Sequence, residues 1–215
     1  IPFTEQILFR NDEILVADKP HFLPVTPGGR YVEECLLNRL RARTGIAGLA
    51  PLHRLDRETA GLVIFSVNPE TRAAYHELFM KGKVEKIYHA LAGLHQPPRE
   101  NRWTVENRIV RGEPRFRMKL VPGIANARSH IQLLEVQDHR GLFRLQPVTG
   151  KTHQLRLHLS SLGFGIINDR VYPDLQPERD DDFDRPLQLL AGEIRFHDPV
   201  AGTDRKFRSE RKLFW

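Results

Sequence analysis

Apolar positions cluster or alternate in several short stretches of the chain, a pattern typical of a protein built from both strands and helices. Strands are expected at 7–9, 14–17, 62–65, 84–93, 129–138, 142–148 and 187–196. Helices are expected at 32–43, 69–81 and 154–162. Between 95 and 126 the apolar stretches are short and predict no clear element.

Local capping signals support the second helix. Asn68 is expected as its N-cap, Pro69 at its first position, and Gly82 at its end. Its buried stripe is expected at Ala73, Ala74, Leu78 and Phe79. Asp138–Gly141 predicts a tight β-hairpin connection.

The segment 51–68 combines a charged cluster with an apolar run. His53 to Glu58 are polar apart from Leu55, and Leu62 to Phe65 predict a buried strand. Asp56 therefore lies on a loop that leads into the core, where a rigid strand can hold a carboxylate in place. The alternative is a surface ion pair with a neighbouring arginine, which contributes roughly 0–1 kcal/mol.

Charge and composition narrow the class of protein. The chain has 215 residues, a formal net charge of +6 and an isoelectric point near 9.7, which favours a polyanionic partner. Its one cysteine, Cys35, excludes an internal disulfide and a cysteine-based zinc site, and is expected in the core. No apolar run is long enough to cross a membrane, and a cytoplasmic protein is expected.

Two features suit contact with nucleic acid. Basic side chains interleave with aromatic ones over the segment from Trp103 to Lys119. Tyr88 is the one aromatic residue of the strand expected at 84–93. Its alternatives are a packed core tyrosine and a stacking face for a nucleobase.

Three apparent ligand motifs fail on spacing. Gly150-Lys151-Thr152 resembles the end of a phosphate loop, but Leu145 stands where that loop needs glycine. His153 and His158 are five positions apart, whereas one metal on a helix requires four. The acidic run 178–184 lacks the glycine and spacing of a calcium loop and is expected to be an exposed loop. No metal site is therefore predicted.

Four segments resemble, in order, the motifs of the RluA-type pseudouridine synthase family. They are Asp18–Pro20, His53–Leu62, Lys86–Ala90 and Gly150–Leu159. After the fourth motif the family commonly has Gly-His-Pro-Ile-x-Gly-Asp, whereas this chain ends the equivalent loop in Asn168-Asp169. Ala60 stands where the family usually has serine.

The resemblance implies specific roles. Asp56 is expected as the catalytic carboxylate, Arg156 as its ion-pair partner and Tyr88 as the residue that stacks on the uracil. Substrate or RNA contacts are expected from Arg54, Arg57, His53, Leu157, Lys19 and Lys86. Lys19 taken alone is expected to face solvent.

The family also implies an α+β fold with a mixed, mostly antiparallel central sheet, flanking helices and a central cleft. One catalytic domain is expected over residues 1–215, with no separate RNA-binding domain in front. The implied reaction is isomerisation of uridine to pseudouridine in ribosomal or transfer RNA, by a monomer, without cofactor or metal. A non-catalytic RNA-binding domain and a hydrolase of glycosidic bonds, with Glu58 as its second carboxylate, are the alternatives.

Overall fold

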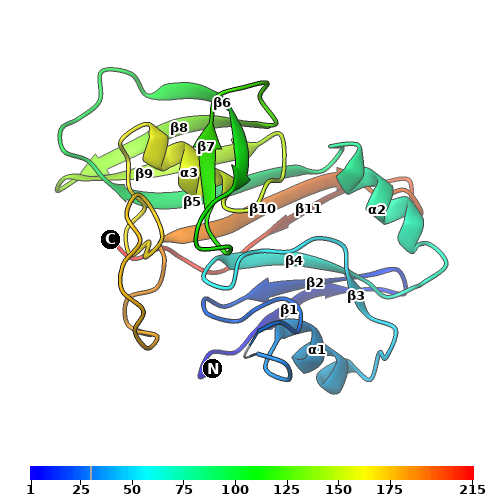
Figure 1. The fold of residues 1–215 in the computed structure, drawn as a ribbon. Coiled ribbons are helices and arrows are strands. Elements are labelled where there is room, and N and C mark those ends of the chain that lie inside the picture. Colours follow the sequence, from blue (N-terminus) through cyan, green and yellow to red (C-terminus); the bar gives the residue numbers. More distant parts are fainter. Residues whose placement is uncertain (30) are drawn as a thin grey trace. The chain divides into compact units, whose positions relative to one another are not determined.

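The computed structural model describes residues 1–29 and 31–215 and is shown in Figure 1. The chain forms two compact units. The first comprises Ile1–Lys86 and Ala191–Arg211, and the second comprises Ile87–Leu190 and Lys212–Trp215. The chain passes from one unit to the other within strands β5 (Glu85–Gly93) and β10 (Leu189–His197).

The first unit is organised around two strands that are buried along their whole length. β2 (Ile14–Lys19) pairs antiparallel with β4 (Ala60–Ser66), and every residue of both strands is buried. β1 (Gln6–Arg10) pairs with β2, and the short β3 (Ala50–Pro51) pairs with β4. β11 (Asp204–Arg208) pairs with β10. The unbroken apolar runs in the sequence therefore reflect burial on both faces.

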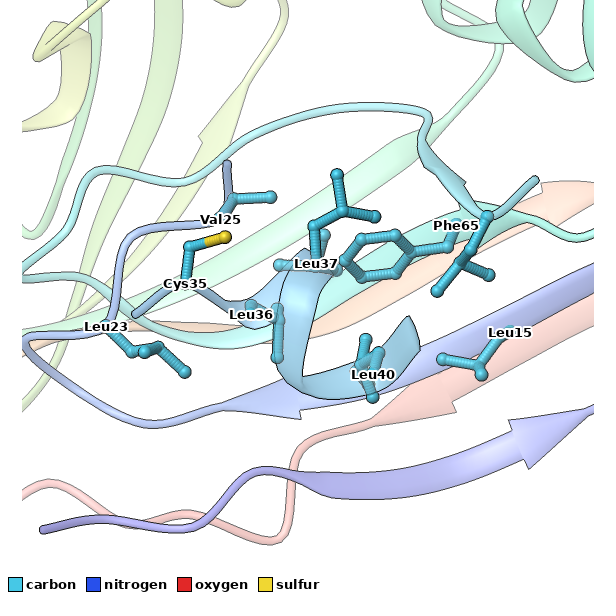
Figure 2. Close-up of a cluster of buried hydrophobic side chains, with 11 residues drawn as sticks. Leu15, Leu23, Val25, Cys35, Leu36, Leu37, Leu40 and Phe65 are labelled. Carbon is cyan, nitrogen blue, oxygen red and sulfur yellow. The ribbon is translucent and has the colours of Figure 1, made fainter. Parts of the chain in front are cut away.

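Alternate side chains of β2 and β4 enter two different hydrophobic clusters. Leu15 and Phe65 belong to a cluster formed with helix α1 (Leu36–Thr44), whose buried leucines gather beside them in Figure 2. Ile14 and Ile64 belong to a cluster on the opposite face. A strand with period-two side chains can supply both clusters only because each face is covered.

Helix α1 begins later than predicted. Cys35 precedes it in extended conformation, with φ of −143°, and Val32 is exposed, so the expected start at residue 32 is wrong. The expectation that Cys35 lies in the core is confirmed, because its side chain is fully buried in the cluster of Figure 2. Gly45 ends the helix in the left-handed region, and its N–H donates to the Arg41 carbonyl at 2.9 Å.

Helix α2 (Arg72–Met80) also differs in detail from its prediction. Asn68 caps a preceding turn by accepting the Glu70 N–H, so it is not the N-cap of the helix. Tyr75 is the buried residue of α2, whereas the predicted Ala73 is exposed. The Tyr75 hydroxyl donates to Asp198 at 2.7 Å, which satisfies a polar group that apolar patterning does not detect.

The second unit contains an antiparallel sheet in the order β5–β9–β8–β6–β7. Its strands are β6 (Arg102–Arg111), β7 (Met118–Val121), β8 (Ala127–Gln137) and β9 (Arg140–Pro147). The predicted hairpin is β8–β9, whose turn residues Asp138 and His139 have φ of 44° and 62°. Such angles match the mirror-image turns that short hairpins favour.

Strands β6 and β7 lie in the segment for which no element was predicted. Along β6, exposed polar residues alternate with half-buried ones, and only Ile109 is buried. Trp103, Val105 and Ile109 lie at alternate positions of β6, but the polar Asn107 interrupts the alternation and β7 has only four residues. Pairing with β8 and β7 supplies the order that the local sequence does not indicate.

Helix α3 (Gln154–Ser161) covers one face of this sheet. Leu155 and Leu159 pack into a cluster with Phe143 and Leu145 of β9 and Ile131 of β8. A smaller cluster joins Leu157 of α3 to Ile109 of β6 and to Tyr172, and Figure 1 shows β7 beside α3. The β6–β7 hairpin is thus attached to the helix.

The predicted α+β class is confirmed. Among the described residues there are three α-helices, and the strand pairings given above are all antiparallel. Within residues 1–29 and 31–215, no helix has both the length and the apolar character needed to cross a membrane.

Gly61, the second residue of β4, has no room for a side chain. Its φ is +113°, and a Cβ atom there would lie 2.3 Å from the backbone oxygen of Ala191. A Cβ at residue 61 is bonded directly to the backbone of β4, and the oxygen belongs to the backbone of β10. Neither atom can move away without displacing its strand. Gly61 therefore fixes the close approach of β4 and β10 within the first unit, five residues after Asp56.

We expect Gly61→Ala to lower the free energy of unfolding by about 2–4 kcal/mol, because it adds both a clash and an unfavourable φ. Urea denaturation measures the effect. The control is Gly45→Ala, where φ is +72° but nothing lies within 4 Å of the added Cβ, so only about 1 kcal/mol is expected. Equal losses in the two variants would contradict the close-contact explanation.

Candidate active site

Asp56 lies on a tight turn that precedes β4. The Thr59 N–H donates to the Asp56 carbonyl at 3.1 Å, which closes the turn, and Thr59 itself is buried. The Asp56 residue is half-buried, and Arg54 before it is exposed. The turn therefore presents a carboxylate near the surface while its far end is fixed in the core.

The two carbonyl groups after Asp56 are held by side chains from the end of β2. The Lys19 ammonium donates to the Arg57 carbonyl at 3.0 Å, and it also donates to the carbonyls of Pro20 at 3.0 Å and Leu23 at 2.7 Å. His21 Nδ1 lies 2.7 Å from the Glu58 carbonyl, which can only accept, so this nitrogen is the donor. The Asp56 turn is thus bound to a separate segment of the first unit.

Lys19 is completely buried, which corrects the expectation that it faces solvent. An ammonium group has three N–H bonds, and each has a carbonyl acceptor here, so Lys19 is not available to an RNA phosphate. Burial lowers the pKa of Lys19 to about 7, while the negative charges of Glu58 and Asp56 oppose that shift. The residue positions the turn instead of contacting substrate.

His53 also forms a hydrogen bond with a backbone group. Its Nε2 atom accepts the Ile64 N–H at 3.1 Å, and its ring stacks on Phe79 with centroids 4.8 Å apart. Burial lowers the pKa of His53 to about 3, and the positive charge of Lys86 acts in the same direction. The ring is neutral at pH 7 and joins the motif to β4 through Nε2, and its expected contact with RNA stays a prediction.

The remaining basic residues of this region differ in their exposure to solvent and in the partners they already have. Arg54 is exposed and open to solvent. Arg57 donates to the Tyr31 hydroxyl at 3.0 Å and to the Glu58 carboxylate at 2.8 Å, and its guanidinium lies 5.3 Å from the Tyr31 ring centre. Lys86 is half-buried, and burial lowers its pKa. An RNA contact stays a prediction for Arg54, Arg57 and Lys86.

In the second unit, the fourth motif forms the start of α3. His153 adopts left-handed backbone angles, with φ of 55°, immediately before the helix. The buried Gln154 amide donates to the Arg128 carbonyl at 2.9 Å and to the Ser129 hydroxyl at 2.8 Å, both on β8. Its amide oxygen accepts the Lys151 N–H at 3.0 Å. Gln154 therefore fixes the beginning of α3 against the sheet.

Arg156 is held by a buried carboxylate that the sequence analysis did not identify. Its Nε donates to Asp169 Oδ2 at 2.7 Å and its Nη2 to Asp169 Oδ1 at 2.6 Å. The two side chains are 3% and 1% exposed, so this bidentate pair is shielded from water. Asp169 Oδ1 also accepts the N–H groups of Val171 and Tyr172.

Tyr172 completes the support around Arg156. Its ring centre lies 5.3 Å from the Arg156 guanidinium and 5.5 Å from that of Arg117. The tyrosine hydroxyl accepts the Met118 N–H at 2.8 Å and lies 2.9 Å from His153 Nδ1. The guanidinium of Arg156 is therefore fixed by an ion pair in its plane and an aromatic ring against it.

Tyr88 and Leu157 occupy two different environments of the second unit. Tyr88 pairs with Leu145 across β5 and β9, is half-buried, and packs against the cluster that α3 covers. Leu157 is buried against Ile109 and Tyr172, where it supports the β6–β7 hairpin. Contact of either side chain with uridine stays a prediction. Asp56 belongs to the first unit and Arg156 to the second, so their pairing also stays a prediction.

The groups that sequence reasoning missed are Asp169, Tyr172 and His21. One signal pointed to Asp169, because the loop after the fourth motif keeps the aspartate at the end of the family pattern although Phe164, Gly165 and Asn168 depart from it. His21 and Tyr172 carry no such signal. Their roles depend on hydrogen bonds to residues 37 and 54 positions away along the chain.

Comparison with known proteins places these motifs in one family. Residues 13–161 match the family described as RNA pseudouridylate synthase, which covers the Asp56 turn, β5 and the start of α3. The chain belongs to this family.

Relatives from distant organisms agree with that assignment. An RNA pseudouridine synthase of Helicobacter pylori is 32% identical over 176 residues, which is 79% of this chain and 58% of that protein. The mitochondrial tRNA pseudouridine(32) synthase of Saccharomyces cerevisiae is 30% identical over 172 residues, covering 78% of this chain and 37% of that protein. Human pseudouridylate synthase RPUSD2 is 29% identical over 174 residues, covering 78% and 30%.

Solved structures show the same fold. Human RNA pseudouridylate synthase domain containing 1 superposes with a TM-score of 0.76 at 25% identity, over 97% of this chain and 84% of that one. The chain spans between about a third and somewhat over half of the length of the curated relatives described above.

We predict that the half-buried His53, whose Nε2 accepts a backbone N–H, makes the first unit sensitive to acid. An unfolded histidine binds a proton below pH about 6.5, whereas the folded ring remains neutral until pH about 3. The unfolded state therefore gains protons first, and the free energy of unfolding should fall by about 1.4 kcal/mol per pH unit from this group over that window.

Urea denaturation between pH 7 and 4 should show a shallower decline for His53→Gln than for the unaltered chain. His95→Gln changes an exposed residue and is the control, for which the slope should match that of the unaltered chain. Parallel curves for all three proteins would contradict the prediction.

We also predict that Asp169→Ala destabilises the second unit by about 3–5 kcal/mol, because it leaves the Arg156 guanidinium buried without its carboxylate. Urea denaturation followed by circular dichroism measures the loss. The control is Asp204→Ala, which removes an exposed partner of His197 and should change stability little. A loss below about 1 kcal/mol for Asp169→Ala would be inconsistent with a buried pair.

Proposed function

We propose that this chain isomerises uridine to pseudouridine in structured RNA, ribosomal or transfer. The observation that carries the proposal is the family match over residues 13–161, which includes each of the motif residues Asp56, Tyr88 and Arg156. The net charge of +6 agrees with a polyanionic substrate. The yeast relative is named for a transfer RNA position.

The reaction breaks the C1′–N1 glycosidic bond, turns the uracil and forms a C1′–C5 bond. The proton on C5 is lost and N1 gains a proton, so the product is an isomer of the substrate. This chemistry needs an ionised carboxylate beside the ribose and the base. We assign that role to Asp56, because its turn is rigidly tethered while the residue itself is only half-buried.

Arg156 is proposed to favour the ionised form of that carboxylate. Its support suits this task, because Asp169 and Tyr172 restrain the guanidinium before any substrate arrives. A restrained charge loses little freedom when it binds, which is the basis of preorganised electrostatic catalysis. Tyr88 is proposed to stack on the uracil, which must leave its helix or loop to reach the carboxylate.

A hydrolase of glycosidic bonds receives no specific support. Such enzymes use two carboxylates at a set separation, and Glu58 is the candidate partner closest in sequence. The Glu58 carboxylate accepts from both Nε and Nη2 of Arg57, at 3.0 and 2.8 Å. A carboxylate held in an ion pair is poorly suited to donate a proton to a leaving group.

The test is Asp56→Asn, assayed by mapping pseudouridine in unmodified cellular RNA. We expect pseudouridine formation to fall by at least about 1,000-fold, the scale of losing a catalytic group, while RNA affinity is retained. The matched control is Asp12→Asn, the same chemical change in an exposed turn of the first unit, which should leave activity intact.

Retained turnover in Asp56→Asn would refute the assigned role. Free uracil among the products of the unaltered chain would instead indicate hydrolysis. RNA binding without pseudouridine in any RNA would support the non-catalytic alternative.

A further inference from the structure

Phe116 is a large aromatic residue that the fold leaves in solvent. It lies in the loop Gly112–Arg117 between β6 and β7, and 58% of its surface is exposed. A single exposed apolar side chain needs no special explanation by itself. The surroundings of this one, however, are ordered, basic and attached to the Arg156 site.

The loop is closed by its own backbone. The Gly112 N–H donates to the Arg117 carbonyl at 2.8 Å, and the Arg117 N–H donates to the Pro114 carbonyl at 2.7 Å. These bonds span the loop from end to end and give Phe116 a defined attachment. An exposed ring on such a turn pays less conformational entropy on binding than one on a flexible segment.

Arg117 connects the loop to the support of Arg156. Its Nη2 donates to the Pro173 carbonyl at 2.5 Å, and its guanidinium lies 5.5 Å from the ring centre of Tyr172. The same ring lies 5.3 Å from the Arg156 guanidinium. Phe116 is therefore one residue away from a side chain that shares its aromatic partner with the motif arginine.

The residues around Phe116 are mostly cationic. Arg111, Arg115 and Lys119 are exposed on the loop and the adjoining strand ends, and Glu113 is the one acidic residue between positions 111 and 119. Aromatic rings set among cations are typical of surfaces that bind single-stranded nucleic acid, with the rings stacking on bases and the cations contacting phosphates.

We propose that Phe116 stacks on an unpaired RNA base that flanks the modified uridine, while Arg115 contacts the adjacent phosphate. The proposal rests on the proposed function, because it assigns this loop to the RNA that Asp56 and Arg156 are proposed to act on. A base next to an extruded uridine has lost one stacking neighbour, and an exposed phenyl ring can replace it.

The binding experiment uses fluorescence anisotropy with two labelled probes of about 12 nucleotides, within the site sizes of single-strand binders. One is an oligouridylate, and the other is an abasic ribose-phosphate oligomer of equal length and charge. We expect Phe116→Ala to weaken oligouridylate binding about fivefold or more, to leave abasic binding unchanged, and to be rescued by Phe116→Trp.

Two control variants distinguish stacking by Phe116 from the loss of any exposed apolar side chain and from the loss of a charge. Leu134→Ala removes another exposed apolar side chain of the second unit and should bind both probes normally. Arg115→Ala should weaken both probes and lower the slope of log affinity against log salt by about 0.7, as expected for one phosphate contact on a single strand.

Equal affinities of Phe116→Ala and the unaltered chain for oligouridylate would overturn the inference, as would equal losses for both probes. The inference would also be overturned if the unaltered chain bound oligouridylate no more tightly than the abasic oligomer. The exposed ring would then be better explained by contact with a protein.

The assay of pseudouridine on cellular RNA separates the two proposals. Base-dependent binding through Phe116 without any pseudouridine would refute the proposed function and retain the stacking. Normal turnover with unchanged KM in Phe116→Ala would refute the stacking alone.

Discussion

The buried ammonium of Lys19 is the interaction on which the first unit's candidate site depends. A lysine without access to water is unfavourable unless its N–H bonds find acceptors, and here three backbone carbonyls provide them. Those carbonyls come from the β2–α1 connection and from the residue after Asp56. Together with His21, which binds the Glu58 carbonyl, Lys19 ties the β2–α1 connection to the Asp56 turn at the end of the β2–β4 pairing.

The second unit also contains a buried cation, but a side-chain carboxylate, not backbone carbonyls, accepts its hydrogen bonds. Its buried cation, Arg156, is satisfied by a carboxylate, and the carboxylate in turn accepts two backbone N–H groups of the loop that carries it. Removing either partner would leave a charge in the core, which is why such pairs are strongly coupled. In the first unit the buried cation holds the turn that carries Asp56, and in the second unit the buried carboxylate holds Arg156 of α3 itself.

Two motif residues of the first unit have a supporting role in the described structure. Lys19 and His53 attract attention because they are polar residues in recognisable motifs, yet both direct their polar atoms at backbone groups. The basic residues that are exposed to solvent, such as Arg54 beside the Asp56 turn and the cations around Phe116, are the ones proposed to contact RNA. Lys19 and His53 thus support the backbone around the Asp56 turn, whereas the exposed Arg54 makes no such contact with a backbone group among the hydrogen bonds described above.

Much of the framework follows from the sequence alone. The buried strands β2 and β4 were predictable from their unbroken apolar runs, and the β8–β9 hairpin and helix α3 from apolar positions that repeat with the period of the element. The motifs around Asp56, Tyr88 and Arg156 also identified the family, since long motifs in a fixed order rarely arise together by chance.

Tertiary structure alone decided the rest. β6 has an interrupted apolar alternation, β7 is short, and both are ordered by their neighbours. Helix α1 begins later than its apolar spacing predicts, and α2 begins later than its capping signals predict. The burial of Lys19, the partnership of Arg156 with Asp169 and the position of the Phe116 loop beside Tyr172 arise from contacts between distant segments. Local sequence specifies which side chains prefer to avoid water, but the partner of a buried charge is fixed only when the chain has packed.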